Sequence, residues 1–127
     1  MIRYLLVAIG GGAGALARYV AASAIMARFG GKFPLGTLVI NVSGSFMIGF
    51  LMTILTERFR LNPNWRFLLV VGFLGGYTTF SSFAWETYSA VRDGSLGTGM
   101  LNVVSSVMLG YVAVLLGSLF GSNLGRR

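Results

Sequence analysis

The sequence predicts an all-α membrane protein with four transmembrane helices. Of its 127 residues, 55% are hydrophobic and 10% are charged, whereas soluble domains average about 25% charged residues. The few charges separate four long apolar runs, each near the roughly 20 residues that a helix needs to cross about 30 Å of hydrocarbon. The runs do not alternate in polarity as the strands of a membrane β-barrel do. We therefore expect helices, in a single membrane domain covering 1–127.

The four expected spans are bounded by charged and turn-forming residues. They cover 4–27, 35–56, 67–91 and 97–121. Arg18 interrupts the first run, which we therefore interpret as a span and not as a cleaved signal peptide. The second span is uncharged, the third contains Glu86 as its one charge, and the fourth lies in an uncharged stretch from 94 to 125.

Short connections predict antiparallel neighbouring helices, with both termini and the middle loop on one side of the membrane. That side carries six cations and the opposite side three: Arg3, Arg58, Arg60, Arg66, Arg126 and Arg127 against Arg28, Lys32 and Arg92. The positive-inside rule then favours cytoplasmic termini, although so modest a bias suits insertion in both orientations equally well. Because the cations lie on both faces, nucleic-acid binding is not expected.

The inventory of reactive side chains argues against an enzyme. The chain has no Cys and no His, which excludes disulfides and thiol chemistry and removes the commonest general base and metal ligand. Its three carboxylates, Glu57, Glu86 and Asp93, are far apart in sequence.

Polar residues form two stripes at helical spacing. Thr37, Asn41 and Ser45 share one face of the second span. In the fourth span the residues with this spacing are Asn102, Ser106 and Gly110. An asparagine at membrane depth is costly unless its amide has partners. The stripes therefore indicate either hydrogen bonds between helices or a polar track for a permeating species.

The third span contains the most distinctive segment, residues 72–83. Gly75 and Gly76 are poor helix formers, and the β-branched pair Thr78 and Thr79 follows, so we expect the helix to be interrupted near 75–79. Backbone carbonyls freed at membrane depth must be buried in protein or must bind a ligand. Such oxygens suit an alkali cation, and a simple kink is the alternative.

Aromatic and charged residues follow that interruption. Phe80 and Phe83 share a helix face, and the positive edge of an aromatic ring can meet an anion, although ordinary aromatic contacts are the alternative. Ser82 and Glu86 form a second stripe. Arg18 and Glu86 are charges inside the membrane and hence functional candidates. Arg18 could extend to the interface, cap the carbonyls of another helix or pair with Glu86.

Over its whole length the chain resembles the Fluc (CrcB) fluoride ion channels of microorganisms. The resemblance is carried by Arg18 in the glycine-rich first span, by residues 36–38 leading to Asn41, and above all by residues 72–83 followed by Glu86 and Thr87. It implies a passive, highly selective channel that exports fluoride across the inner membrane and protects against fluoride toxicity. It also implies an antiparallel, dual-topology homodimer with two pathways, each lined by both subunits.

The resemblance further implies roles for individual residues. Asn41 would point its amide at fluoride, and Phe80 and Phe83 would contact the ion through their ring edges. The backbone carbonyls of Gly75 and Thr78 would hold a central Na⁺ between the subunits. Hydroxyl groups along the pathway would come from Thr37, Thr79, Ser81, Ser82 and Ser106, and Arg18 and Glu86 would lie near the pathway or its vestibule.

The chain departs from the pattern of some relatives at two positions. Asn102 and Gly110 stand where a tyrosine and a serine are expected. Gly110 supplies no hydroxyl, so water or other side chains would have to serve there.

Two other functions fit the size of the chain. A small dual-topology multidrug exporter depends on a carboxylate in its first span, and 4–27 contains no Asp or Glu. A subunit that assembles without transporting anything is the third alternative.

Overall fold

Four long apolar helices form the fold. The computed structural model describes residues 1–58 and 61–124, with the side chain of Arg58 left out. Its elements are α1 (Ile2–Phe29), α2 (Leu35–Met52), η1 (Thr53–Arg58), η2 (Arg66–Leu74), α3 (Gly75–Tyr77), α4 (Phe80–Arg92) and α5 (Leu96–Asn123), of which η1 and η2 are π-helical.

The helices long and apolar enough to cross a membrane are Ile2–Phe29, Leu35–Glu57, Arg66–Arg92 and Leu96–Asn123. Each of the four expected spans lies within one of them, so the prediction of four long apolar helices is confirmed. Arg60, Arg126 and Arg127, which entered the orientation argument, lie outside the described residues.

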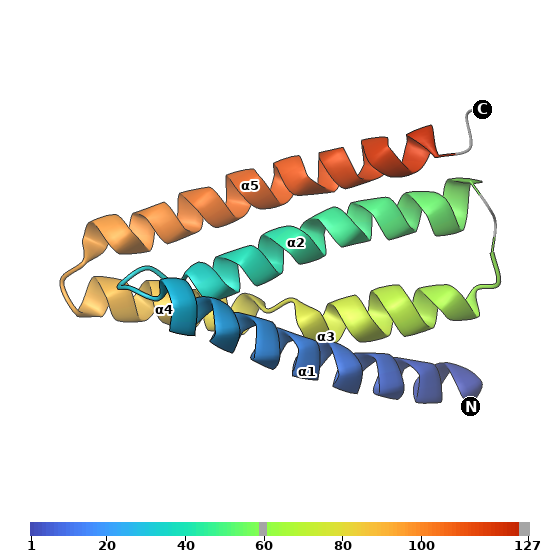
Figure 1. Ribbon diagram of the computed structural model, residues 1–127, viewed down its shortest axis with the longest axis horizontal. Coiled ribbons are helices and arrows are strands. Elements are labelled where there is room, and N and C mark those ends of the chain that lie inside the picture. Colours follow the sequence, from blue (N-terminus) through green and yellow to red (C-terminus); the bar gives the residue numbers. More distant parts are fainter. Residues whose placement is uncertain (59–60, 125–127) are drawn as a thin grey trace.

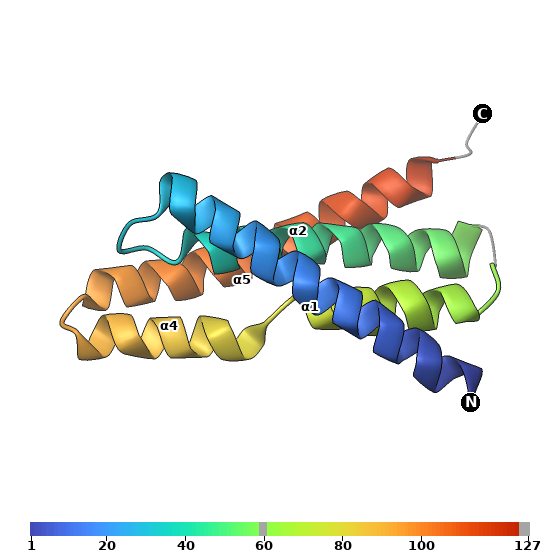
Figure 2. The same cartoon turned by 60° about the horizontal axis from the view of Figure 1, so that its bottom comes forward.

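The helices run alternately up and down, as the short connections predict. The start of α1, the ends of η1 and α5 and the start of η2 lie at one end of the molecule (Figure 1). The α1–α2 and α4–α5 connections lie at the opposite end. Turned by 60° about the horizontal axis, the view keeps α2 beside α5 and shows α1 crossing the other helices obliquely (Figure 2).

Glycines set two close helix contacts. A Cβ at Gly14 of α1 would overlap the carbonyl of Phe73 in η2, and one at Gly117 of α5 would overlap the carbonyl of Phe46 in α2. Small residues allow backbones to approach this closely in membranes. The bundle thus contains two tight pairs, α1 with η2 and α2 with α5.

Large apolar side chains remain exposed over much of the single chain. On α5, Val107 and Met108 are both 61% exposed, and the buried hydrophobic residues of the described chain are Ile40, Leu55, Leu74 and Ala113. An apolar surface of this extent suits contact with lipid or with another protein.

The third long segment contains two residues with extended backbone. Thr78 (φ −81°, ψ 157°) and Thr79 (φ −151°, ψ 117°) connect α3 to α4. The Thr79 hydroxyl oxygen accepts a hydrogen bond from the Ser82 amide at 3.2 Å, as an N-cap residue does. This side chain therefore marks where helix resumes, and it places Phe80 in the first turn of α4.

Candidate functional site

A groove of about 420 Å³ lies between α2, the third segment and α5. It is lined by eight of the residues singled out from the sequence: Asn41, Ser45, Gly75, Thr78, Thr79, Phe80, Phe83 and Ser106. Residues far apart in the sequence, from α2, α3, α4 and α5, thus contribute to one site.

Asn41 holds the extended backbone by its side chain. Its Nδ2 donates to the Thr79 carbonyl at 2.9 Å, and the Thr79 amide donates to its Oδ1 at 2.8 Å. Both polar backbone groups of Thr79 are therefore satisfied. Since an asparagine amide carries two hydrogens, a second N–H remains for another acceptor. The polar stripe in the sequence pointed to Asn41, but helical spacing did not predict this partner.

The neighbouring Thr78 is held from a different helix. Its amide and hydroxyl both donate to the Leu74 carbonyl, at 3.0 and 2.9 Å. Its carbonyl accepts from Arg18 Nη1 of α1 at 3.3 Å. This contact corresponds to the capping of another helix's carbonyl, one of the placements considered for Arg18. All four polar backbone groups of the extended pair thus have partners, as a membrane interior requires.

Gly44, which the sequence analysis did not single out, shapes the same segment. It is buried, and a Cβ at this position would overlap Cγ2 of Thr78. Gly44 and Asn41 lie one turn apart on α2, so a single helix face both seats the Thr78 methyl group and binds the Thr79 backbone.

The carbonyl of Gly75 differs from those of the two threonines. In a continuous helix it would accept from the Thr79 amide, but that amide donates to Asn41. Within residues 1–58 and 61–124 the Gly75 carbonyl accepts no hydrogen bond. Gly75 is exposed and lines the groove. A free carbonyl is a hard oxygen donor of the kind an alkali cation takes. The Thr78 carbonyl already accepts from Arg18, so its oxygen would have to serve both the guanidinium and such an ion.

Two aromatic rings form one wall of the groove. The centroids of Phe80 and Phe83 are 5.6 Å apart with an interplanar angle of 47°. Phe80 is 79% exposed, which leaves its ring edge accessible. Ser106 of α5 lines the same groove.

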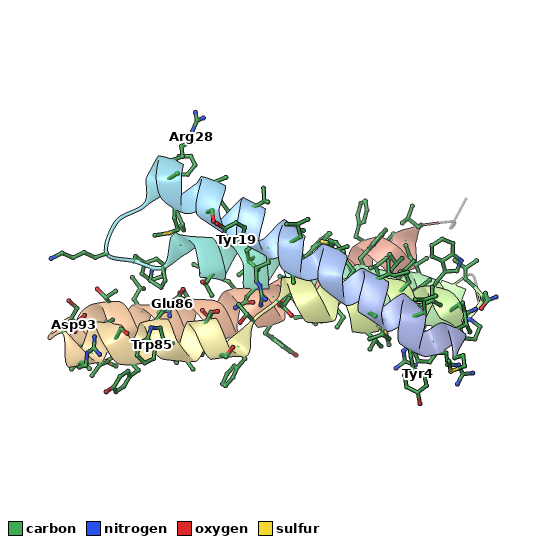
Figure 3. All side chains as sticks on the ribbon, turned by 90° about the horizontal axis from the view of Figure 1, so that it is seen from below. Tyr4, Tyr19, Arg28, Trp85, Glu86 and Asp93 are labelled. Carbon is green, nitrogen blue, oxygen red and sulfur yellow. The ribbon has the colours of Figure 1, made fainter. Side chains whose placement is uncertain are left out.

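The remaining polar candidates lie around two further cavities. One, of about 740 Å³, is lined by Lys32, Thr37, Glu86 and Asp93 among others. Glu86 Oε1 accepts from the Thr37 hydroxyl at 2.6 Å, while its buried Oε2 has no partner in the described chain. Figure 3 places Trp85, Glu86 and Asp93 toward the same end of the molecule as Arg28. The described residues form no Arg18–Glu86 ion pair.

The second of these cavities, of about 290 Å³, shares lining residues with the 740 Å³ cavity and with the groove. It is lined by Arg18, Thr37, Thr79 and Ser82 among others. Thr37 also lines the 740 Å³ cavity and Thr79 also lines the groove. Ser81 lines none of these three cavities and is exposed, with its hydroxyl 3.4 Å from that of Thr79.

The two polar stripes are divided by the structure. Asn41, Ser45 and Ser106 line the groove, whereas Thr37 lies outside it. Asn102 is 1% exposed and donates to Thr87 Oγ1 of α4 at 2.9 Å. For Asn102, therefore, the hydrogen bond between helices is the interpretation that the structure bears out.

The sequence matches a known family over most of its length. Residues 5–118 match the model described as "CrcB-like protein, Camphor Resistance (CrcB)". The chain belongs to the CrcB family. A relative of this CrcB chain from Solibacter usitatus (strain Ellin6076) is 61% identical over 99% of the chain and 100% of the relative. A relative from Acidobacterium capsulatum is 46% identical over 97% of the chain and 98% of the relative. Both relatives are named "Fluoride-specific ion channel FluC".

With four helices suited to spanning a membrane, this CrcB chain is an integral, multi-pass membrane protein.

Proposed function

We propose that this chain is a passive, fluoride-selective ion channel that exports fluoride across the inner membrane and so protects the cell from fluoride toxicity. The observation that carries the proposal is the 61% identity, over 99% of the chain, to a protein named as a fluoride-specific ion channel. A channel needs no catalytic residues, in keeping with a chain that lacks Cys and His.

The groove offers fluoride the kinds of donor that can replace its water. Fluoride is small and strongly hydrated, so its dehydration demands several good hydrogen-bond donors. The second N–H of Asn41 and the hydroxyl of Ser106 are such donors, and the edges of Phe80 and Phe83 add weak positive potential. The Thr79 hydroxyl, which donates to Ser82 Oγ at 3.1 Å, would have to turn from Ser82 to serve the ion. None of these groups is a fixed cation that would trap the ion in place.

The two further cavities suggest how the ion reaches the groove. Thr37 belongs to both of them, and Thr79 belongs to the 290 Å³ cavity and to the groove. We assign the hydroxyls of Thr37 and Ser82 to this approach, and Arg18 and Glu86 to its vestibule. We place Ser81, whose hydroxyl is 3.4 Å from that of Thr79, beside the approach and not in its lining. The inside-negative membrane potential then drives the anion outward, at about 2.3 kcal/mol per charge per 100 mV.

A second, antiparallel copy of the chain would complete the pathway. Phe80, although it belongs to the groove, is 79% exposed in the single chain. A partner subunit would cover this open side, and a dual-topology homodimer would bring two such grooves together. Insertion in both orientations also agrees with the modest charge bias of the loops.

A central Na⁺ fits the free carbonyl of Gly75. Neutral backbone oxygens match an alkali cation, and the described residues contain no cluster of three or more His, Cys, Asp or Glu that would suit another metal. We assign the carbonyls of Gly75 and Thr78 as Na⁺ ligands. The bound ion would raise the positive potential near the groove.

Neither alternative function is favoured. A proton-coupled multidrug exporter of this size needs a carboxylate in its first helix, and α1 contains no Asp or Glu. The named relatives are ion channels, which also argues against a subunit that assembles without transporting.

Fluoride release from liposomes tests the function directly. The purified protein would be reconstituted in liposomes loaded with KF, valinomycin added, and external fluoride followed with an electrode. We expect rapid fluoride release, whereas chloride-loaded liposomes should stay sealed. Release no faster than from protein-free liposomes would overturn the proposal.

A further inference from the structure

A buried amide outside the groove joins two of the elements that form it. Asn102 of α5 is 1% exposed and lines none of the three cavities. Its Nδ2 donates to Thr87 Oγ1 of α4 at 2.9 Å, and the Thr87 hydroxyl donates to the Phe83 carbonyl at 2.9 Å. Because the Thr87 oxygen accepts from Asn102, its own hydrogen is left for Phe83, so the direction of both bonds is fixed.

The other end of the same amide meets the opposite wall of the groove. Asn102 Oδ1 lies 3.5 Å from the hydroxyl oxygen of Ser106, one turn further along α5. Hydrogen bonds between a hydroxyl and an oxygen are usually 2.5–3.0 Å long, so this contact is weak. A stronger acceptor in the groove, such as an anion, could take the Ser106 hydrogen at little cost.

We propose that Asn102 is a positioning residue for the groove, and this proposal rests on the proposed fluoride channel. Through Thr87 it fixes the turn of α4 that carries Phe83, and through its Oδ1 it holds the hydroxyl of Ser106 at rest. It thereby sets the two walls of the groove relative to each other without touching the ion.

This positioning role of Asn102 differs from the role of a residue in a polar track. An asparagine in the track would face the permeating ion, whereas here both ends of the amide face protein. Replacing Asn102 by leucine, which is similar in size, would leave Thr87 without its donor and let α4 shift against α5. Hydrogen bonds between membrane helices have modest strength, so we expect about a three- to tenfold loss of transport rate.

A double-mutant cycle tests the coupling. Asn102→Leu and Thr87→Val would be made singly and together, and fluoride release would be measured per folded channel. Each single variant should lose about three- to tenfold, and the double variant should lose no more than the worse single one, because both changes break one chain of bonds. Thr87→Ser, which keeps the hydroxyl, should retain the wild-type rate.

A matched hydrogen bond elsewhere separates positioning from general stability. The Thr53 hydroxyl lies 3.1 Å from that of Ser118 on α5, and Thr53 is 4% exposed and outside the groove. Thr53→Val should lower the thermal stability but leave the rate per folded channel unchanged. If it lowered that rate as much as Asn102→Leu does, Asn102 would be merely structural.

Other outcomes would also overturn the proposal. One is a fluoride release rate in Asn102→Leu equal to that of the wild type. The other is a loss in the double variant that equals the product of the losses in Asn102→Leu and Thr87→Val. Should Asn102→Leu fail to fold, the release rates of Thr87→Val and Thr87→Ser decide. Equal rates in these two variants would overturn the proposal. Should the wild-type protein release no fluoride, the channel function itself has failed. The coupling is then judged from thermal unfolding, where independent effects of the two changes would overturn it.

Discussion

Asn41 and Thr79 are joined by two hydrogen bonds that run in opposite directions. The asparagine amide donates to the Thr79 carbonyl at 2.9 Å, and its oxygen accepts from the Thr79 amide at 2.8 Å. A side chain of α2 thus replaces, for one residue of the third segment, the partners that a helix would provide. In the proposed pathway, Asn41 would therefore couple the shape of the groove to its chemistry.

We predict that Asn41→Asp strongly lowers fluoride transport while the proposed dimer persists. An aspartate can still accept from the Thr79 amide, but it cannot donate to the Thr79 carbonyl and its charge repels an anion. An unpaired buried polar group costs about 1–3 kcal/mol, so a loss of roughly tenfold or more is expected in liposome release. Val39→Ala, on the same helix but outside the groove, is the control. Undiminished release from Asn41→Asp would remove this residue from the pathway.

The helices could be predicted from the sequence because the bilayer sets their length. Lys32 and Glu57 bound the second apolar stretch, and Arg66 and Arg92 bound the third. At each end of these two stretches the observed helix differs from the expected span by at most one residue. Long apolar runs leave little choice of secondary structure, since irregular backbone is costly in lipid. The π-helical turns of η1 and η2 carry no such signal in the sequence and were not predicted.

The partners of the polar residues could not be predicted in the same way. Spacing puts Asn41 and Asn102 on helix faces, but their partners Thr79 and Thr87 are 38 and 15 residues away along the chain. Which faces meet depends on how α2, α4 and α5 are rotated. That rotation is set by close contacts such as Gly117 against Phe46, whose partners a helical pattern does not specify.

Phe80→Ile should lower fluoride release strongly with little change in thermal stability. The Phe80 side chain is 79% exposed in the single chain, so its removal leaves no large cavity there, whereas isoleucine has no positive ring edge for an anion. Phe29→Ile, at a residue 64% exposed and outside the groove, should behave as the wild type in both measurements. Equal release from the two variants would exclude an ion contact at Phe80.

Prolonged removal of Na⁺ should reduce transport, and adding Na⁺ back should restore it. The carbonyl of Gly75 has no hydrogen-bond partner among the described residues. Removal of the proposed Na⁺ would therefore leave this carbonyl without a strong interaction. A lower unfolding temperature in choline than in Na⁺ provides a second measurement that does not depend on transport. Full activity and unchanged stability in strictly Na⁺-free solution would instead indicate a simple kink.

Gly44→Ala should destabilise the protein and reduce transport, and Thr78→Ser should restore both. The new Cβ would overlap Cγ2 of Thr78, and crowding a close contact typically costs about 1–3 kcal/mol. Serine lacks that methyl group but keeps the hydroxyl that donates to Leu74, so the double variant should be more stable than Gly44→Ala alone. Gly97→Ala is the matched control, because a Cβ there meets nothing within 4 Å and alanine favours helix. Thermal unfolding and fluoride release would be compared across the set. A double variant no better than Gly44→Ala would show that Gly44 does not act through the Thr78 methyl group.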